Sequence, residues 1–291
     1  MGRIAEALKR AQQERAERLE AHTAALDAGA VALEDAPRVN EPPAIPELLR
    51  EPAPPKPFLV HAKPIPAEQV DTQIATLHAP AAPISEKYRS LRTRLVSGQP
   101  AGASRVLAIT SSLPGEGKSV TAGNLAFSLA ELRHLRVVAV DMDLRGRGLS
   151  KLLGAADRPG ISDILRGEKT LADVCLPLVR PNLFFVPAGD PGDVAPSELL
   201  AGPRPASLFR EINNRFHFGL IDTPPVSTVA DTGLIAPLCH SVLMVVRMRR
   251  TPEPTLRSSI AMLQANHIPI AGCVLAGCVE EEAYVPVRRK G

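Results

Sequence analysis

A glycine-rich turn between an apolar run and a segment of helical period constrains the fold of this chain more than any other feature. The apolar run covers residues 105–110, the helical segment covers 119–132, and the turn between them reads Ser112-Leu113-Pro114-Gly115-Glu116-Gly117-Lys118-Ser119. Its glycines allow the backbone to direct several N–H groups inward, and the helix N-terminus adds a partial positive charge. This order predicts a phosphate-binding loop, although the strict pattern has Gly or Ala where this chain has Ser112. The alternative is an ordinary glycine-rich turn that happens to precede Lys-Ser and binds no phosphate.

Two side chains at the end of the turn add to the predicted phosphate site. The ammonium group of Lys118 can reach the β- and γ-phosphates of a nucleotide, and the hydroxyl of Ser119 can bind Mg²⁺. Together with the backbone N–H groups, they predict a site for ATP and Mg²⁺.

Apolar runs alternate with helical segments from Ile84 onward. Besides 105–110, strands are expected over 137–141, 183–187, 218–222, 241–246 and 271–279. Helices are expected over 85–96, 119–132, 208–216 and 255–266, the first with Ser85 as its N-cap. Strands that are apolar along their whole length are buried on both faces. The pattern therefore predicts an α/β fold with a doubly wound, mostly parallel sheet.

Acidic residues stand at the carboxyl ends of two of these strands, which is where open α/β sheets bind ligands. Asp141 and Asp143 follow one strand, and Asp222 ends another before Pro224-Pro225. Beside a phosphate loop, such carboxylates hold the metal ion or accept a proton from a hydroxyl nucleophile. The alternative is a pair of ordinary strand-end turns with solvated acids.

Prolines divide the N-terminal part of the chain from the rest. Twelve of the 29 prolines lie between residues 37 and 83, a density that excludes long helices and central strands. We therefore expect an extended, solvated linker over 30–83. Residues 1–29 before it are predicted to form an amphipathic helix, which either docks on a partner or frays in solution.

Composition excludes several classes of protein. The net charge of +3 and the absence of Trp argue against nucleic-acid binding, so the basic residues at 247–250 and 288–290 are expected on a solvated or membrane-proximal edge. The four cysteines are scattered, which argues against a disulfide framework or a zinc site. The chain shows no transmembrane run and no signal peptide, so a cytoplasmic location is expected.

The motifs together resemble the bacterial tyrosine kinases of capsule and exopolysaccharide synthesis, a branch of the MinD/ParA-like P-loop ATPases. The resemblance covers about residues 84–279. It is carried by the turn at 112–119, Asp-Met-Asp-Leu-Arg at 141–145, Ile-Asp-Thr-Pro-Pro at 221–225, Glu-x-x-Arg-x-x-Arg at 86–92 and Pro-Ser-Glu-Leu-Leu at 196–200.

The resemblance implies roles for individual residues. Those that would bind the nucleotide are Gly115, Glu116, Gly117, Lys118, Ser119 and Val120. Ser119, Asp141 and Asp222 would hold Mg²⁺, and the residues implied in catalysis are Lys118, Asp141, Asp143 and Asp222. Glu86, Arg89 and Arg92 would pack between subunits of a homo-oligomer; the alternative is a ladder of surface ion pairs.

The chain departs from the family pattern at several positions. Family members carry clustered tyrosines in the C-terminal tail, whereas the tail here, 280–291, has only Tyr284, and Tyr88 is the one other tyrosine in the chain. Arg147 stands where the family usually has Pro. Ala276 replaces an Asn that helps to hold the adenine in related ATPases, so base specificity could be looser.

The expected function is an ATP-dependent protein-tyrosine autokinase that phosphorylates Tyr284 and regulates polysaccharide polymerisation or export. The resemblance also implies a membrane chain-length regulator as partner, which would hold the protein at the inner membrane. Two alternatives remain: a MinD/ParA-like ATPase switch without kinase activity, and a nucleotide-binding scaffold. The lone tail tyrosine favours the scaffold more than a typical family tail would.

Overall fold

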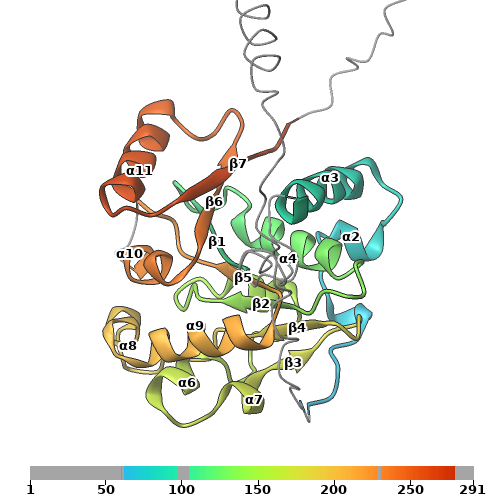
Figure 1. Ribbon diagram of the computed structural model, residues 1–291, viewed down its shortest axis with the longest axis vertical. Coiled ribbons are helices and arrows are strands. Elements are labelled where there is room, and N and C mark those ends of the chain that lie inside the picture. The colour runs from blue at the N-terminus through green and yellow to red at the C-terminus, as the bar shows by residue number, and fades with distance from the viewer. Residues whose placement is uncertain (1–59, 61, 98–104, 228–230, 279–291) are drawn as a thin grey trace, which may run out of the picture. The chain divides into compact units, whose positions relative to one another are not determined.

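The computed structural model describes residues 60, 62–97, 105–227 and 231–278 (Figure 1). The predicted helix over 1–29, the linker up to residue 59 and the tail 280–291 with Tyr284 lie outside these residues. Among the described helices, none combines the length and the apolar composition needed to cross a bilayer.

A seven-stranded sheet forms the centre of the described domain, in the order β3-β4-β2-β5-β1-β6-β7. All neighbouring strands are parallel except β3 and β4. The strands are β1 Arg105–Ser111, β2 Val137–Asp141, β3 Leu176–Pro177, β4 Leu183–Val186, β5 Phe218–Asp222, β6 Ser241–Arg247 and β7 Ile270–Ala276. The predicted doubly wound α/β sheet is confirmed, and the six predicted strands match within three residues at each end.

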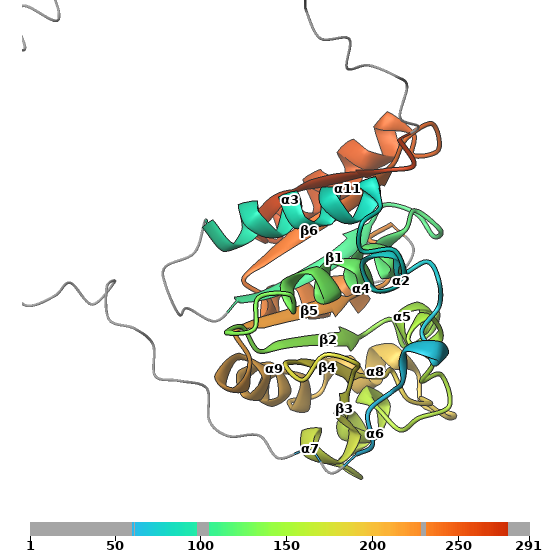
Figure 2. The same cartoon turned by 90° about the vertical axis from the view of Figure 1, so that its right-hand side faces the viewer.

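Helices cover both faces of the sheet (Figure 2). On one face lie η2 Ala67–Gln69, α2 Ala75–His78, α3 Pro83–Ser97, α4 Lys118–Leu129 and α5 Gly148–Leu152. On the other lie α6 Ile161–Arg166, α7 Leu171–Val174, α8 Pro196–Ala201, α9 Arg204–Arg215, α10 Asp231–Ile235, η3 Ala236–Leu238 and α11 Glu253–Ala265. Alternate residues of each central strand enter the two cores, as strands buried on both faces require.

The solvated linker predicted up to residue 83 is wrong for its last part. Ile65, Val70 and Ile74 are buried in the core beneath α4. The backbone is also anchored, since the N–H of Ile65 donates to Pro177 O at 2.9 Å and that of Asp71 to Leu152 O at 2.8 Å. Prolines prevent a long helix here, but they leave apolar residues between them free to pack. The domain therefore begins at or before residue 62 rather than at 84.

The N-cap prediction for α3 is also wrong. The helix begins at Pro83, and Ser85 is buried in its first turn, where its hydroxyl donates to Ala79 O at 2.9 Å. Proline is well suited to a first helical turn because the N–H it lacks would have no partner in the helix.

Candidate nucleotide-binding site

The loop between β1 and α4 has the backbone of an anion cradle. Gly115 and Gly117 take φ values of +75° and +99°, which L side chains rarely adopt. The N–H of Thr121 makes the first bond of α4, to Gly117 O at 2.8 Å. Among the described residues, the N–H groups of 115–119 donate to no oxygen. Inward amides at a helix N-terminus fit a phosphate group.

Lys118 lies buried among the predicted carboxylates. Its Nζ is 2.7 Å from Asp143 Oδ2 and 3.8 Å from Asp222 Oδ1. Burial by itself would lower the pKa of Lys118, but the charges of Asp222 and Asp143 outweigh it and the pKa is raised. The side chain is therefore a fixed cation beside the loop.

Asp141 is fully buried and serves as an acceptor at the centre of the site. Its Oδ2 accepts from the N–H and the hydroxyl of Ser150, both at 2.7 Å, and its Oδ1 accepts from the N–H of Asp143 at 3.1 Å. Burial raises the pKa of Asp141 to about 6, against the hydrogen bonds from Ser150. These bonds fix the turn after β2, so the carboxylate of Asp143 is directed at Lys118.

Asp222 is fully buried beside Asp141, its register partner in the sheet. Neither carboxylate oxygen of Asp222 has a hydrogen-bond partner among the described residues. Burial raises the pKa of Asp222 to about 7, and the charge of Lys118 and the nearby hydroxyl of Ser119 oppose the shift. A buried carboxylate that accepts no hydrogen bond, and whose nearest cation is the Lys118 ammonium at 3.8 Å, can take a ligand that supplies positive charge or hydrogen bonds.

The side chains around Asp222 fit Mg²⁺ bound together with nucleotide phosphates. Ser119 is the second residue of α4, and its hydroxyl would lie 2.6 Å from a Cβ on Gly148, so a side chain at position 148 would displace this hydroxyl. Across the described part of the chain, no cluster of three or more His, Cys, Asp or Glu residues could hold a metal ion. Mg²⁺ is usually bound by one or two carboxylates plus substrate phosphates and water, which matches this donor set.

Two residues predicted to bind the nucleotide direct their side chains elsewhere. The carboxylate of Glu116 is fully buried and accepts from the N–H groups of Ser112 and Leu113 at 2.9 and 3.1 Å. Val120 packs against the core beneath α4. The side chain of Glu116 is thus turned away from a bound nucleotide, and that of Val120 contributes to the core.

The Pro-Pro loop after β5 is held by hydroxyl groups. Pro224 O accepts from Thr110 Oγ1 at 2.8 Å and from Thr232 Oγ1 at 2.7 Å. Sequence reasoning missed both threonines, as it missed Ser150. No local pattern marks them, because their partners are eight to 114 residues away in the chain.

Two departures from the family pattern lie at the site. Arg147 has φ +50°, a value that proline cannot take, so the turn after β2 differs from one with Pro at this position. Ala276, at the end of β7, lies next to the phosphate loop: its Cβ would be 3.9 Å from a Cβ on Gly117. Position 276 is thus close enough to the loop to influence nucleotide contacts.

The three residues predicted at a subunit interface are engaged within the chain. Arg89 binds both carboxylate oxygens of Glu131, at 2.9 and 3.0 Å, and also pairs with Glu86. Arg92 Nη1 lies 2.5 Å from Glu131 Oε2 and donates to Ser128 O at 2.8 Å. These contacts tie α3 to α4.

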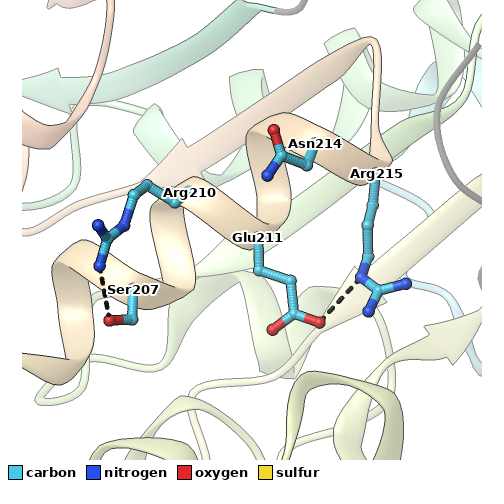
Figure 3. Close-up of a pocket in the computed structure, with 5 residues that line it drawn as sticks. All are labelled: Ser207, Arg210, Glu211, Asn214 and Arg215. Atoms are coloured by element: carbon cyan, nitrogen blue, oxygen red, sulfur yellow. Dashed lines mark hydrogen bonds and ion pairs between the residues drawn. The ribbon is translucent and has the colours of Figure 1, made fainter. Parts of the chain in front are cut away.

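A shallow pocket on α9 lies outside the predicted site (Figure 3). It is lined by Ser207, Arg210, Glu211, Asn214 and Arg215. Arg210 donates to Ser207 at 3.1 Å and Arg215 to Glu211 at 2.8 Å, so the arginines bond to neighbours on the same helix. None of the predicted site residues lines it.

The chain is similar in sequence to proteins described as putative tyrosine-protein kinases. The chain is 36% identical over 196 residues to the putative tyrosine-protein kinase EpsB of Ralstonia nicotianae, covering 67% of this chain and 26% of EpsB. It is 27% identical to the putative tyrosine-protein kinase CapB of Staphylococcus aureus, covering 85% of that protein. The chain thus spans about a quarter of EpsB, but most of CapB. No protein-family model matches.

Solved structures share the fold. The chimeric protein CapA2B2 superposes with a TM-score of 0.65 at 27% identity, over 75% of this chain and 93% of that one. The BceF tyrosine kinase domain gives a TM-score of 0.61 at 28% identity, over 75% of this chain and 93% of that one. Sequence and fold agree, and the chain is similar to the kinase domains of bacterial tyrosine kinases.

Proposed function

We propose that this protein is an ATP-dependent protein-tyrosine kinase that phosphorylates its own C-terminal tail at Tyr284. The observation that carries the proposal is the buried cluster in which Lys118 contacts Asp143 and pairs at 3.8 Å with Asp222, whose carboxylate accepts no hydrogen bond among the described residues. Such a cluster beside the unbonded amides of the loop supports binding and transfer of a phosphoryl group more than any other chemistry.

Each residue of the cluster has a distinct part in the proposed reaction. The amides of 115–119 and the ammonium of Lys118 bind the phosphates and offset the charge that develops during transfer. Ser119 and Asp222 hold Mg²⁺, with Asp141 beside them, and Mg²⁺ when bound supplies further charge neutralisation. Asp143, which retains slight exposure, orients the attacking hydroxyl and accepts its proton.

The choice of Tyr284 as acceptor follows from the position of the other tyrosine. Tyr88 lies on α3, packs against the core and bonds to Thr121, and burial raises the pKa of its phenol. Reaching an active site would require α3 to leave the domain. Tyr284 is the remaining candidate.

Incubation of the purified protein with labelled ATP tests the proposal. We expect protein-bound label in the wild type and in Tyr88→Phe, and none in Tyr284→Phe. Release of free phosphate without retained label would instead support an ATPase switch of the MinD/ParA type. Nucleotide binding with neither product would support a scaffold.

The wider role is proposed from the relatives. The succinoglycan biosynthesis transport protein ExoP of Rhizobium meliloti is 31% identical over 199 residues. We infer a role in regulating polysaccharide polymerisation or export, with a membrane chain-length regulator as partner and a position at the inner membrane through it. Glu86, Arg89 and Arg92 are the proposed contacts of a homo-oligomer. Among them the side chain of Glu86 is the most exposed, at 64%.

A further inference from the structure

A buried carboxylate ties the phosphate loop to a distant turn. Glu116 is fully buried, and its two oxygens have separate tasks. Oε2 accepts from the N–H groups of Ser112 and Leu113, which begin the loop, at 2.9 and 3.1 Å. Oε1 accepts from the hydroxyl of Thr251, which follows β6 and lies 135 residues away in sequence. The carboxylate therefore joins both segments with three donors.

The turn after β6 orients the hydroxyl of Thr251 so that it donates to Glu116. Its oxygen accepts from the N–H of Arg247 at 3.0 Å, while the N–H of Thr251 donates to Arg247 O at 3.0 Å. A hydroxyl has one proton, so with its oxygen engaged by Arg247 the proton is directed to Glu116. Arg249 holds the turn with φ +61°.

The phosphate loop needs these bonds to hold one conformation, because its glycines allow many others. Glu116 stands between Gly115 and Gly117, and glycines populate many conformations at little cost. Without the bonds of Glu116, the amides that face the phosphates would sample other directions, and binding would have to restore them. One further contact reaches the loop from the same turn, from Arg250 Nη1 to Gly115 O, and at 3.4 Å it is long.

We propose that Glu116 and Thr251 are positioning residues that pre-organise the phosphate loop for nucleotide. Neither side chain touches the nucleotide. The proposal rests on the proposed nucleotide site, but it does not depend on whether phosphate is transferred to tyrosine.

Titration with a fluorescent ADP analogue tests the pair in the full chain. Thr251→Val keeps the shape of the side chain and removes the hydroxyl, whereas Thr251→Ser keeps the hydroxyl. We expect Thr251→Val to raise Kd about tenfold and Thr251→Ser to bind within about twofold of wild type. Glu116→Gln should also weaken binding, and adding Thr251→Val to it should cost less than tenfold, because both changes break the same bond.

A thermal melt without nucleotide separates positioning from folding. Weaker binding by Thr251→Val, folded at the assay temperature and rescued by Ser, supports the proposal. Wild-type affinity in Thr251→Val would overturn it, as would equal losses in the Val and Ser variants. If the wild type binds nucleotide but transfers no label, the kinase proposal fails and the positioning role stands. If wild type binds no nucleotide, both fail.

Discussion

Lys118 Nζ lies 2.7 Å from Asp143 Oδ2, with the two side chains only 10% and 9% exposed. The ammonium is thus neutralised within the chain and held beside the phosphate loop. A nucleotide phosphate at the loop would share this cation with Asp143, and the lysine side chain would not have to become ordered on binding. Such an arrangement keeps the buried lysine charged, because a buried cation without a partner would lose its proton.

Replacing this lysine tests the nucleotide site itself. Lys118→Met should weaken ATP and ADP binding at least about tenfold, because it removes the buried cation that faces the phosphates. The measurement is a nucleotide titration monitored by calorimetry. Lys151→Met is the control, since Lys151 lies on α5 and its ammonium donates to Gly146 O at an exposed position. Unchanged affinity in Lys118→Met would contradict the proposed site.

Asp222 makes stability depend on pH. Burial raises its pKa from 3.8 to about 7, so the folded protein binds the proton more tightly than the unfolded chain does. Ionisation of Asp222 therefore destabilises the folded state increasingly as pH rises from 3.8 to about 7, and this destabilisation reaches its full size above pH 7. Without ligands, Asp222→Asn should melt at least about 3 °C above wild type at pH 8, with a smaller gap at pH 5. A lower melting temperature at pH 8 would mean that attraction to Lys118 outweighs burial.

Glu131 joins α3 to α4 through two arginines. Burial would raise its pKa, but the hydrogen bonds from Arg89 and Arg92 outweigh it and the pKa is lowered. Glu131→Gln should reduce the free energy of unfolding by about 2 kcal/mol at pH 7, measured with denaturant. The difference should narrow as pH falls through the lowered pKa, where wild type also loses the charge. Glu198→Gln, at an exposed position on α8, is the control. If Glu131→Gln lost no more unfolding free energy than this control, the contact between α3 and α4 would not stabilise the fold.

Ile74 tests whether residues 62–82 belong to the folded domain. The side chain is fully buried, and its Cδ1 would lie 2.6 Å from a Cβ on Gly123 of α4. Ile74→Ala should cost about 2–5 kcal/mol in denaturant unfolding, because it leaves a cavity against α4. Ile84→Ala, at a position 49% exposed, should change stability by less than about 0.5 kcal/mol. Equal effects of the two substitutions would argue that the segment contributes no packing.

The central strands and the phosphate loop could be predicted from sequence because their signals are local. Val137–Asp141 and Phe218–Asp222 are short apolar runs that end in aspartate, and their predicted bounds equal the observed ones. The sequence does not predict the short helices α2, α5, α6, α7, α8 and α10. Helices of four to six residues show too few turns for a period to be visible.

Local sequence by itself determined the strand–turn–helix order, the positions of the aspartates and the glycines that shape the loop. Only the tertiary structure decided that Ile74 packs under α4, that Glu131 binds Arg89 and that Glu116 bonds to Thr251. The physical reason is the distance along the sequence over which each interaction acts. A loop or strand follows from backbone preferences and the polarity of adjacent residues, whereas a buried carboxylate takes whichever donors the packed sheet and helices bring to it.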